Sequence, residues 1–235
     1  MAVVALTVDA RPARPAAPVT VEPGTGPSPT DDGAQIAERR RAVTIAGHRG
    51  ERGVAEAARS DPAATVRASA LGALARMGEL HVEDVAGALA DPDPGVRRRA
   101  ADLAPPFGSR LCAALTAALE DPDTLVVEAV SAALGELGDP AAVGPLATLA
   151  RDHRDPLCRE SAVAALGAIG DPAGLPAILD ATSDRAAVRR RAVLALAPFS
   201  GPEVDEALAR ALQDRDWQVR QAAEDLSGDG TAPPP

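Results

Sequence analysis

Apolar residues recur at helical spacing along most of this chain, and the clearest example lies in residues 121–140. There, Val126, Val130, Leu134 and Leu137 stand at positions i, i+4, i+8 and i+11. With 3.6 residues per turn, these side chains share one face of a helix. The stretch therefore predicts an amphipathic helix that has one face for burial.

Turn-forming residues stand at both ends of this helix. At 121–122, the carboxylate of the aspartate can accept the free N–H groups of the first turn. The proline after it lacks a backbone N–H, which is not needed as a donor at the first position of a helix. Gly138 suits the left-handed position that closes a helix. Asp139-Pro140 then opens a partner helix, in which Val143 and Leu146 again follow a helical period. The unit is a pair of helices, and neither helix can bury its apolar face alone.

The same unit recurs along the chain at intervals of 30 to 32 residues. The apolar anchor of its capped helix stands at Val66, Val96, Val126, Cys158, Val188 and Val219. An arginine follows the anchor at Arg67, Arg97, Arg159, Arg189 and Arg220, and Val127 interrupts this series. A fixed period in this range is the signature of a stacked solenoid. We therefore predict an all-α fold, an α–α superhelix of about six to seven helical hairpins.

These residues resemble the HEAT-like repeats first associated with phycobilisome (bilin) lyases, whose helical pairs read approximately D-P-x-x-x-V-R-x-x-A-x-x-A-L-G-x-L-G-D-P. The resemblance extends over about residues 34–227. It implies an α-solenoid in which the second helix of each repeat, here the one that bears the anchor, lines a concave face. It also implies that the Asp and Arg of the motif form a ladder between repeats. Because unrelated activities occur on this repeat, it implies a fold more than a function.

The predicted solenoid ends where proline and glycine become frequent. Residues 1–33 have Pro- and Gly-rich sequence without apolar periodicity, so we predict a disordered N-terminal arm. Residues 34–227 form the predicted solenoid, and residues 228–235 a disordered tail. Pro105-Pro106 and Pro198 fall in the last turn of anchor-bearing helices, which we therefore expect to end early.

Composition and charge narrow the function classes. The chain is 46% hydrophobic but only 1% aromatic, and its formal net charge is −10, which disfavours nonspecific binding to nucleic acid or anionic lipid. No apolar run approaches the ~20 residues of a membrane helix, and the first residues lack a basic secretion signal, so we expect a cytoplasmic protein. Cys158 replaces an anchor, which favours a small buried hydrophobe over a disulfide or metal ligand.

Histidines are the obvious candidates for metal chemistry. Deoxyhypusine hydroxylases share this repeat type and are recognised by paired His-Glu steps that hold iron. Here the steps are His48-Arg49, His81-Val82 and His153-Arg154, and we interpret all three histidines as solvated surface residues. A bilin pocket would need a sizeable apolar or aromatic lining, and the chain has two Phe, one Trp and no Tyr. We therefore predict no catalytic residue, no metal site and no cofactor.

In each repeat, the side chains of the second and third residues after the anchor should point outward from the concave face. These residues are Ala68-Ser69, Arg98-Arg99, Glu128-Ala129, Glu160-Ser161, Arg190-Arg191 and Gln221-Ala222. This neutral, basic, acidic, acidic, basic, neutral order lacks the continuous positive stripe that a phosphate backbone needs, so we do not expect nucleic acid as a partner. The arginines directly after the anchors are better explained as structural ties between repeats.

The sequence thus predicts a non-catalytic scaffold or adaptor that binds a protein or peptide partner on its concave face, with no membrane and no small-molecule substrate. The candidate partner-binding residues are Arg98, Arg99, Glu128, Glu160, Arg190 and Arg191. The resemblance leaves two alternatives open. One is an enzyme of the lyase or deoxyhypusine-hydroxylase-like type, and the other is a HEAT-like DNA-binding protein.

Overall fold

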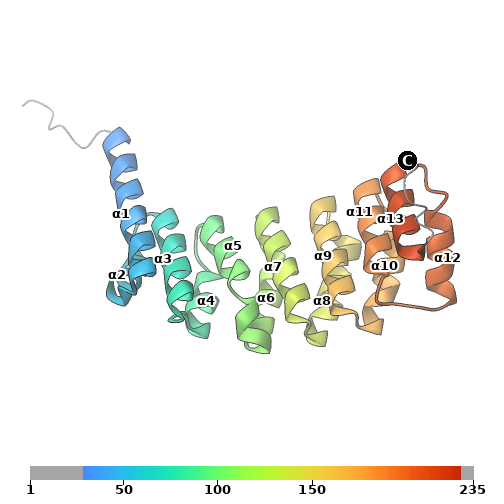
Figure 1. Cartoon of the computed structure of the whole chain (residues 1–235), viewed down its shortest axis with the longest axis horizontal. Coiled ribbons are helices and arrows are strands. Elements are labelled where there is room, and N and C mark those ends of the chain that lie inside the picture. Colours follow the sequence, from blue (N-terminus) through green and yellow to red (C-terminus); the bar gives the residue numbers. More distant parts are fainter. Residues whose placement is uncertain (1–28, 229–235) are drawn as a thin grey trace, which may run out of the picture.

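The computed structural model describes residues 29–228, which are mostly helical and include no strand (Figure 1). The α-helices are α1 (Pro29–Arg49), α2 (Arg52–Ala57), α3 (Ala64–Met77), α4 (Val82–Ala88), α5 (Pro94–Asp102), α6 (Cys112–Ala117), α7 (Thr124–Leu137), α8 (Val143–Asp152), α9 (Pro156–Ile169), α10 (Leu175–Ala181), α11 (Ala186–Ala195), α12 (Pro202–Ala211) and α13 (Trp217–Ser227). Short 3₁₀ helices lie at Ala58–Ser60, Pro105–Leu111, Ala118–Glu120, Pro140–Ala142 and Pro172–Gly174. Residues 1–28 of the predicted arm (1–33) and residues 229–235 of the predicted tail lie outside the described residues. The prediction of disorder was wrong for residues 29–33, because they form the start of helix α1.

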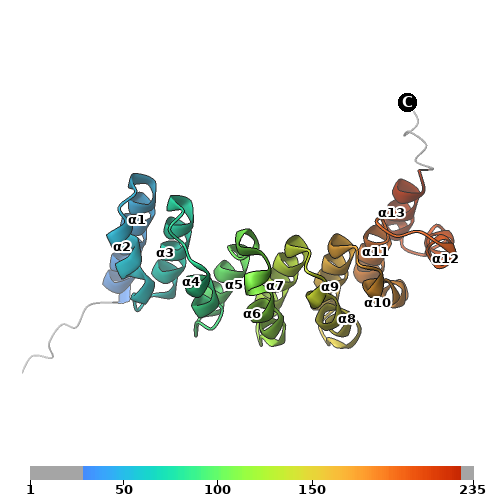
Figure 2. The same ribbon diagram turned by 90° about the horizontal axis from the view of Figure 1, so that it is seen from below.

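The helices form two layers that curve together into an open arc. The odd-numbered helices pack side by side in one layer, and the even-numbered helices form the other (Figure 1). Seen after a 90° turn, the odd-numbered layer lies on the concave side of the arc and the even-numbered layer on the convex side (Figure 2). Residues 29–228 therefore comprise one leading helix and six helical hairpins, from α2–α3 to α12–α13. The predicted all-α superhelix is confirmed.

The anchors of the repeat pattern form the centre of the core. Each of the six anchors is at most 2% exposed, and the residue four positions further along is fully buried in every repeat. These small and medium apolar side chains lie between the two layers along the solenoid. Each hairpin buries its apolar faces against its neighbours, so stability is shared between adjacent repeats.

Helix α7 is capped by a different aspartate from the one that the sequence predicted. Helix α7 begins at Thr124, and its cap is Asp123, whose carboxylate accepts two backbone N–H groups of the first turn. Asp121, the predicted cap, instead accepts the N–H of Asp123 at 2.9 Å and shapes the turn before the helix. An Asp-Pro pair is favourable both in a turn and at a helix start, which is why the sequence misplaced the cap. The helix ends as predicted, at Gly138 with φ of 67°.

Prolines end two of the inner helices early, as predicted. Helix α5 ends three residues before Pro105-Pro106, and α11 ends three residues before Pro198. A proline in the last turn would remove a backbone donor and clash with the preceding turn. Phe107 and Phe199, which follow these prolines, lie partly buried against the core.

Glycines let neighbouring inner helices approach closely. A Cβ on Gly135 would lie 2.9 Å from the Cα of Ala165, and a Cβ on Gly167 would lie 2.7 Å from the Cα of Ala195. Gly47 of α1 is in a comparable position against α3. Side-chain and backbone carbons do not approach to these distances, so a larger residue would push the helices apart.

Gly167→Ala is expected to lower the free energy of unfolding by about 1–3 kcal/mol, because the added methyl group forces α9 away from α11. Gly144→Ala in α8 is the matched control, since its Cβ would meet nothing within 4 Å. That variant is expected to leave stability unchanged or raise it by up to about 1 kcal/mol through helix propensity. Urea denaturation followed by circular dichroism measures both, and equal losses in the two variants would contradict the close-approach explanation.

Candidate functional site

Ion pairs join successive repeats through the loops that precede the inner helices. The Nε and Nη2 atoms of Arg97 donate to the two carboxylate oxygens of Asp121, at 2.6 and 2.8 Å. The same two-point geometry recurs between Arg39 and Asp61, Arg67 and Asp91, Arg159 and Asp184, and Arg189 and Asp214. We call these pairs the Arg–Asp ladder and each pair a rung. The structure thus contains a ladder of the kind that the resemblance implied.

Ladder arginines also hold the loop of their own repeat. The Nη1 atom of Arg97 donates to the backbone carbonyls of Asp91 at 2.8 Å and Pro92 at 3.1 Å. The side chain of Arg97 is 14% exposed and that of Asp121 is 6% exposed. Most N–H groups of this guanidinium are therefore engaged within the solenoid, which fits the predicted structural role rather than ligand binding.

The ladder lowers the pKa of its aspartates below the usual range. For Asp91, Asp184 and Asp214, the main cause is the hydrogen bond from the partner arginine, and a backbone N–H adds to it. For Asp121, burial acts to raise the pKa, but the hydrogen bonds from Arg97 and from the N–H of Asp123 outweigh it. The charged form of each rung is therefore favoured in the folded protein.

The ladder is interrupted between the repeats of α7 and α9. Val127 stands where the neighbouring repeats have the ladder arginine and is fully buried, and His153 stands where they have the ladder aspartate. The Nδ1 atom of His153 accepts the N–H of Asp155 at 3.1 Å, which is the turn bond that Asp121 makes one repeat earlier. Neither the arginine nor the aspartate of a rung is therefore present at this junction. His153 is half-buried, so the prediction of a solvated surface histidine was wrong for this residue.

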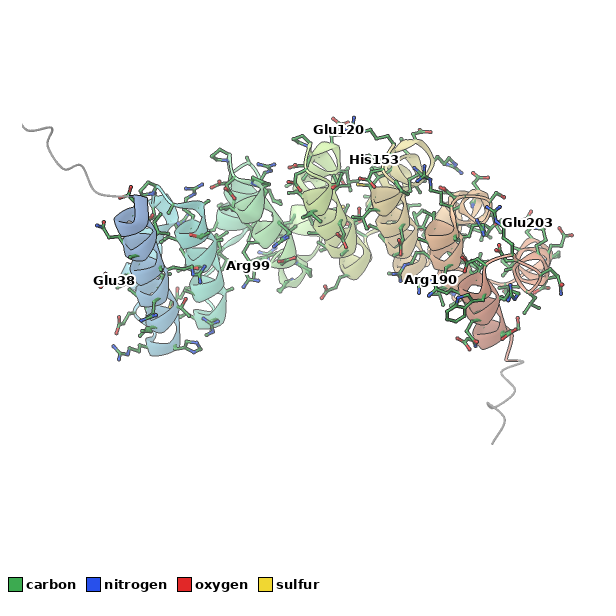
Figure 3. The ribbon with its side chains drawn as sticks, turned by 90° about the horizontal axis from the view of Figure 1, so that it is seen from above. Glu38, Arg99, Glu120, His153, Arg190 and Glu203 are labelled. Atoms are coloured by element: carbon green, nitrogen blue, oxygen red, sulfur yellow. The ribbon has the colours of Figure 1, made fainter. Side chains whose placement is uncertain are left out.

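The candidate partner-binding residues belong to inner helices. Figure 3 shows Arg99 and Arg190 on the concave side of the arc, whereas Glu120, His153 and Glu203 lie on the convex side. By helix, the candidates are Arg98 and Arg99 on α5, Glu128 on α7, Glu160 on α9, and Arg190 and Arg191 on α11.

An open groove of about 340 Å³ crosses the N-terminal half of the inner layer. It is lined by Arg76 of α3 and by Arg98 and Arg99 of α5, and we call it the basic groove. A Cβ on Gly72 would lie 3.0 Å from Nη2 of Arg99, so the glycine leaves room for that guanidinium. The Nη1 atom of Arg99 lies 4.0 Å from Oδ2 of Asp102. Arg76 and Arg98 have no salt bridge within the described residues.

A second open groove, of about 290 Å³, lies over α7 and α9 and extends to α11. Small residues, including Ala132, Ala164 and Ala168, line it together with Leu157, Glu128, Glu160 and Arg191, and we call it the central groove. The Nη2 atom of Arg191 donates to Oε1 of Glu160 at 3.4 Å. Glu128 is exposed and forms no salt bridge within the part of the chain that the structure describes.

The structure thus divides the candidates between two surfaces. The two arginines of α5 share the basic groove, and Glu128, Glu160 and Arg191 share the central groove. Arg190 is on the concave side but lines neither groove.

Sequence reasoning missed Arg76 and three exposed leucines on the inner helices. Leu157, 36% exposed, lines the central groove, and Leu125, 47% exposed, has the same place directly before an anchor. Leu194, 40% exposed, has the same repeat position as Ala164 of the groove. A position-by-position comparison of the repeats would have found these leucines, because other repeats have small or polar residues at the same positions.

The chemistry available within residues 29–228 is limited. No group of three or more His, Cys, Asp or Glu side chains in this range could hold a metal ion. Cys112 and Cys158 are free and buried, and burial raises the pKa of Cys158 to about 11, which disfavours a reactive thiolate. In the same range, no helix combines the length and the apolar content that crossing a bilayer requires.

Comparison with known proteins places the repeats in a family. The family model described as HEAT repeats matches residues 85–167 and again residues 145–227, which together span more than half of the chain. Human deoxyhypusine hydroxylase in complex with glycerol is a similar solved structure, with 24% identity and a TM-score of 0.47 over 68% of this chain. The match covers 66% of that chain, just under two thirds, and is too distant to bear on activity. The comparison with curated proteins gave no match.

Proposed function

Because the chain belongs to the HEAT-repeat family, we propose that it is a non-catalytic scaffold or adaptor that binds a protein or peptide segment along its concave face. Stacked helical pairs create an extended concave surface, which suits an extended segment of a partner. Binding would use side chains that the solenoid leaves unpaired, not the arginines that join its repeats.

The observation behind this proposal is the pair of open grooves on the concave layer. Arg76, Arg98 and Glu128 line them without a salt bridge in the described residues, in contrast to the engaged ladder arginines. Leu157 adds a large, partly exposed apolar side chain to the lining of the central groove. Protein interfaces combine an apolar centre with a polar surround, and the lining of the central groove offers both kinds of side chain.

Several finer predictions from the sequence stay predictions. They are the phycobilisome-lyase type of the repeat, the disorder of residues 1–28 and 229–235, and the cytoplasmic location. A lyase-like or hydroxylase-like enzyme and a DNA-binding protein are the alternatives. The described residues include no cluster of metal-ligating side chains that favours the hydroxylase-like enzyme, and Glu128 and Glu160 of the central groove disfavour a DNA backbone.

Photo-crosslinking tests the proposed face. A photoreactive amino acid replaces Ala168, which is exposed and lines the central groove, and in a matched control it replaces Thr148, which is exposed on α8. The full chain is used to select binders from a random peptide library. We expect the selected peptides to crosslink from position 168 and not from position 148, because the two positions lie on opposite layers.

Two results would overturn the proposal. One is crosslinking mainly from position 148, which would place binding on the convex layer. The other is a selection that enriches no peptide able to crosslink from position 168.

A further inference from the structure

We infer that the bound segment is bipartite, with acidic residues for the basic groove and, about six residues further along, an apolar residue beside a basic one for the central groove. This inference rests on the proposed function and specifies its partner. The argument uses the charges of the two grooves and the spacing between them.

The basic groove has the chemistry to bind carboxylates. Three guanidinium groups, from Arg76, Arg98 and Arg99, line one groove together with a single carboxylate, that of Asp102. This local positive excess stands out in a chain whose formal net charge is −10. A guanidinium fork matches a carboxylate in a bidentate geometry, so acidic side chains are the complementary partner.

Helix α1 extends the positive surface. Arg39 forms the first rung of the ladder with Asp61, just as Arg97 forms a later one. The two residues after Arg39 are Arg40 and Arg41, which are exposed and have the same places in the helix as Arg98 and Arg99 after Arg97. The repeat register thus puts arginine pairs from α1 and α5 on the same layer, on either side of α3.

The central groove has the opposite charge and is lined by small apolar residues as well. Glu128 is exposed without a salt bridge in the described residues, and Glu160 keeps a 3.4 Å contact with Arg191. The small alanine side chains of the lining leave room for an apolar side chain, which could contact Leu157 of the same groove. An apolar residue next to a lysine or arginine fits both features.

The charge order favours a peptide over a nucleic acid. A phosphate backbone that bound Arg98 and continued along the inner layer would meet Glu128 and Glu160, which repel it. A peptide can change the sign of its charge along its length, so it can satisfy both grooves.

The spacing follows from the helix layer. The basic groove lies over α3 and α5 and the central groove over α7 and α9, so their centres are two inner helices apart. Packed helices stand about 8–10 Å apart, so two spacings give a separation of roughly 16–20 Å. An extended chain advances about 3.3 Å per residue, so about six residues connect the two grooves.

A synthetic probe tests this arrangement with the full chain. The probe contains three glutamates, a six-residue Gly-Ser spacer, one leucine and one lysine, and it is made in both chain directions. Fluorescence anisotropy measures its affinity. We expect one direction to bind, and Arg98→Glu and Arg76→Glu each to weaken binding at least about tenfold. Arg210→Glu on α12 is the matched control, an exposed arginine of the outer layer, and should leave the affinity unchanged.

A charge swap tests the second half. Glu128→Lys should weaken binding of the lysine-containing probe, and a probe with glutamate in place of that lysine should bind this variant more tightly than the wild type. The inference is overturned if the Arg98→Glu and Arg210→Glu variants bind the probe with equal affinity. It is also overturned if the glutamate probe binds the Glu128→Lys variant no more tightly than it binds the wild type. If library peptides then still crosslink from position 168, the proposed function stands. Loss of that crosslinking would overturn the proposed function itself.

Discussion

Val127→Arg is expected to lower the free energy of unfolding by about 3 kcal/mol or more, because it places an unpaired guanidinium at a fully buried position. His153→Asp, added to it, is expected to recover about 1–3 kcal/mol of this loss. Arg at 127 and Asp at 153 would occupy the two ends of the missing rung, where the neighbouring repeats form bidentate pairs. The coupling free energy from a double-mutant cycle, measured by urea denaturation, should be about 1–3 kcal/mol.

The control for this cycle is Val130→Arg. Val130 is as fully buried as Val127, but it occupies a different position in the repeat, where the other repeats have an alanine. His153→Asp should therefore not rescue it. A coupling energy within about 0.5 kcal/mol of zero for the first pair would contradict the assignment of a missing rung.

Asp121→Asn is expected to destabilise the protein by about 2–4 kcal/mol at pH 7, because it leaves the largely buried guanidinium of Arg97 without its counter-charge. Asp180→Asn is the matched control. The Arg151–Asp180 pair has a similar distance, 2.8 Å, but its side chains are 42% and 63% exposed. Its loss should cost less than about 1 kcal/mol. Equal losses in the two variants would contradict the role of burial.

The effect of Asp121→Asn should also depend on pH. The folded pKa of Asp121 lies below its unfolded value of about 3.9, so its stabilisation is fully present above that value. It is lost as the pH falls through the folded pKa, where the carboxylate of the wild type takes up a proton. The difference in unfolding free energy between wild type and variant should therefore shrink as the pH is lowered from 5 towards 2.

The sequence was sufficient for the parts of the fold that repeat. The anchors, such as Val126, recur at a fixed period, so their burial and the helical pairing followed from spacing alone. The early ends of α5 and α11 followed from the missing N–H of proline. These features depend on local chemistry, which is visible within one or two helices.

Features that depend on contacts between repeats were not accessible in the same way. The role of His153 required knowing that its Nδ1 replaces an aspartate oxygen in the turn. The basic groove combines Arg76 with Arg98 from the next inner helix, and the sequence alone does not show that these side chains line one surface. The charge order along the repeats pointed to candidate residues on α5, α7, α9 and α11. It did not show that most of them divide between two separate grooves.

The interrupted ladder makes one junction between repeats differ from the others in the interactions that hold it. Bidentate hydrogen bonds are directional, so they oppose both sliding and separation of adjacent repeats. At Val127 the contact is apolar, and apolar contacts oppose separation but have no preferred direction within the interface. The two halves of the arc are therefore each joined by rungs, whereas the junction between α7 and α9, beneath the central groove, is held by apolar packing that includes the close approach of Gly135 to Ala165.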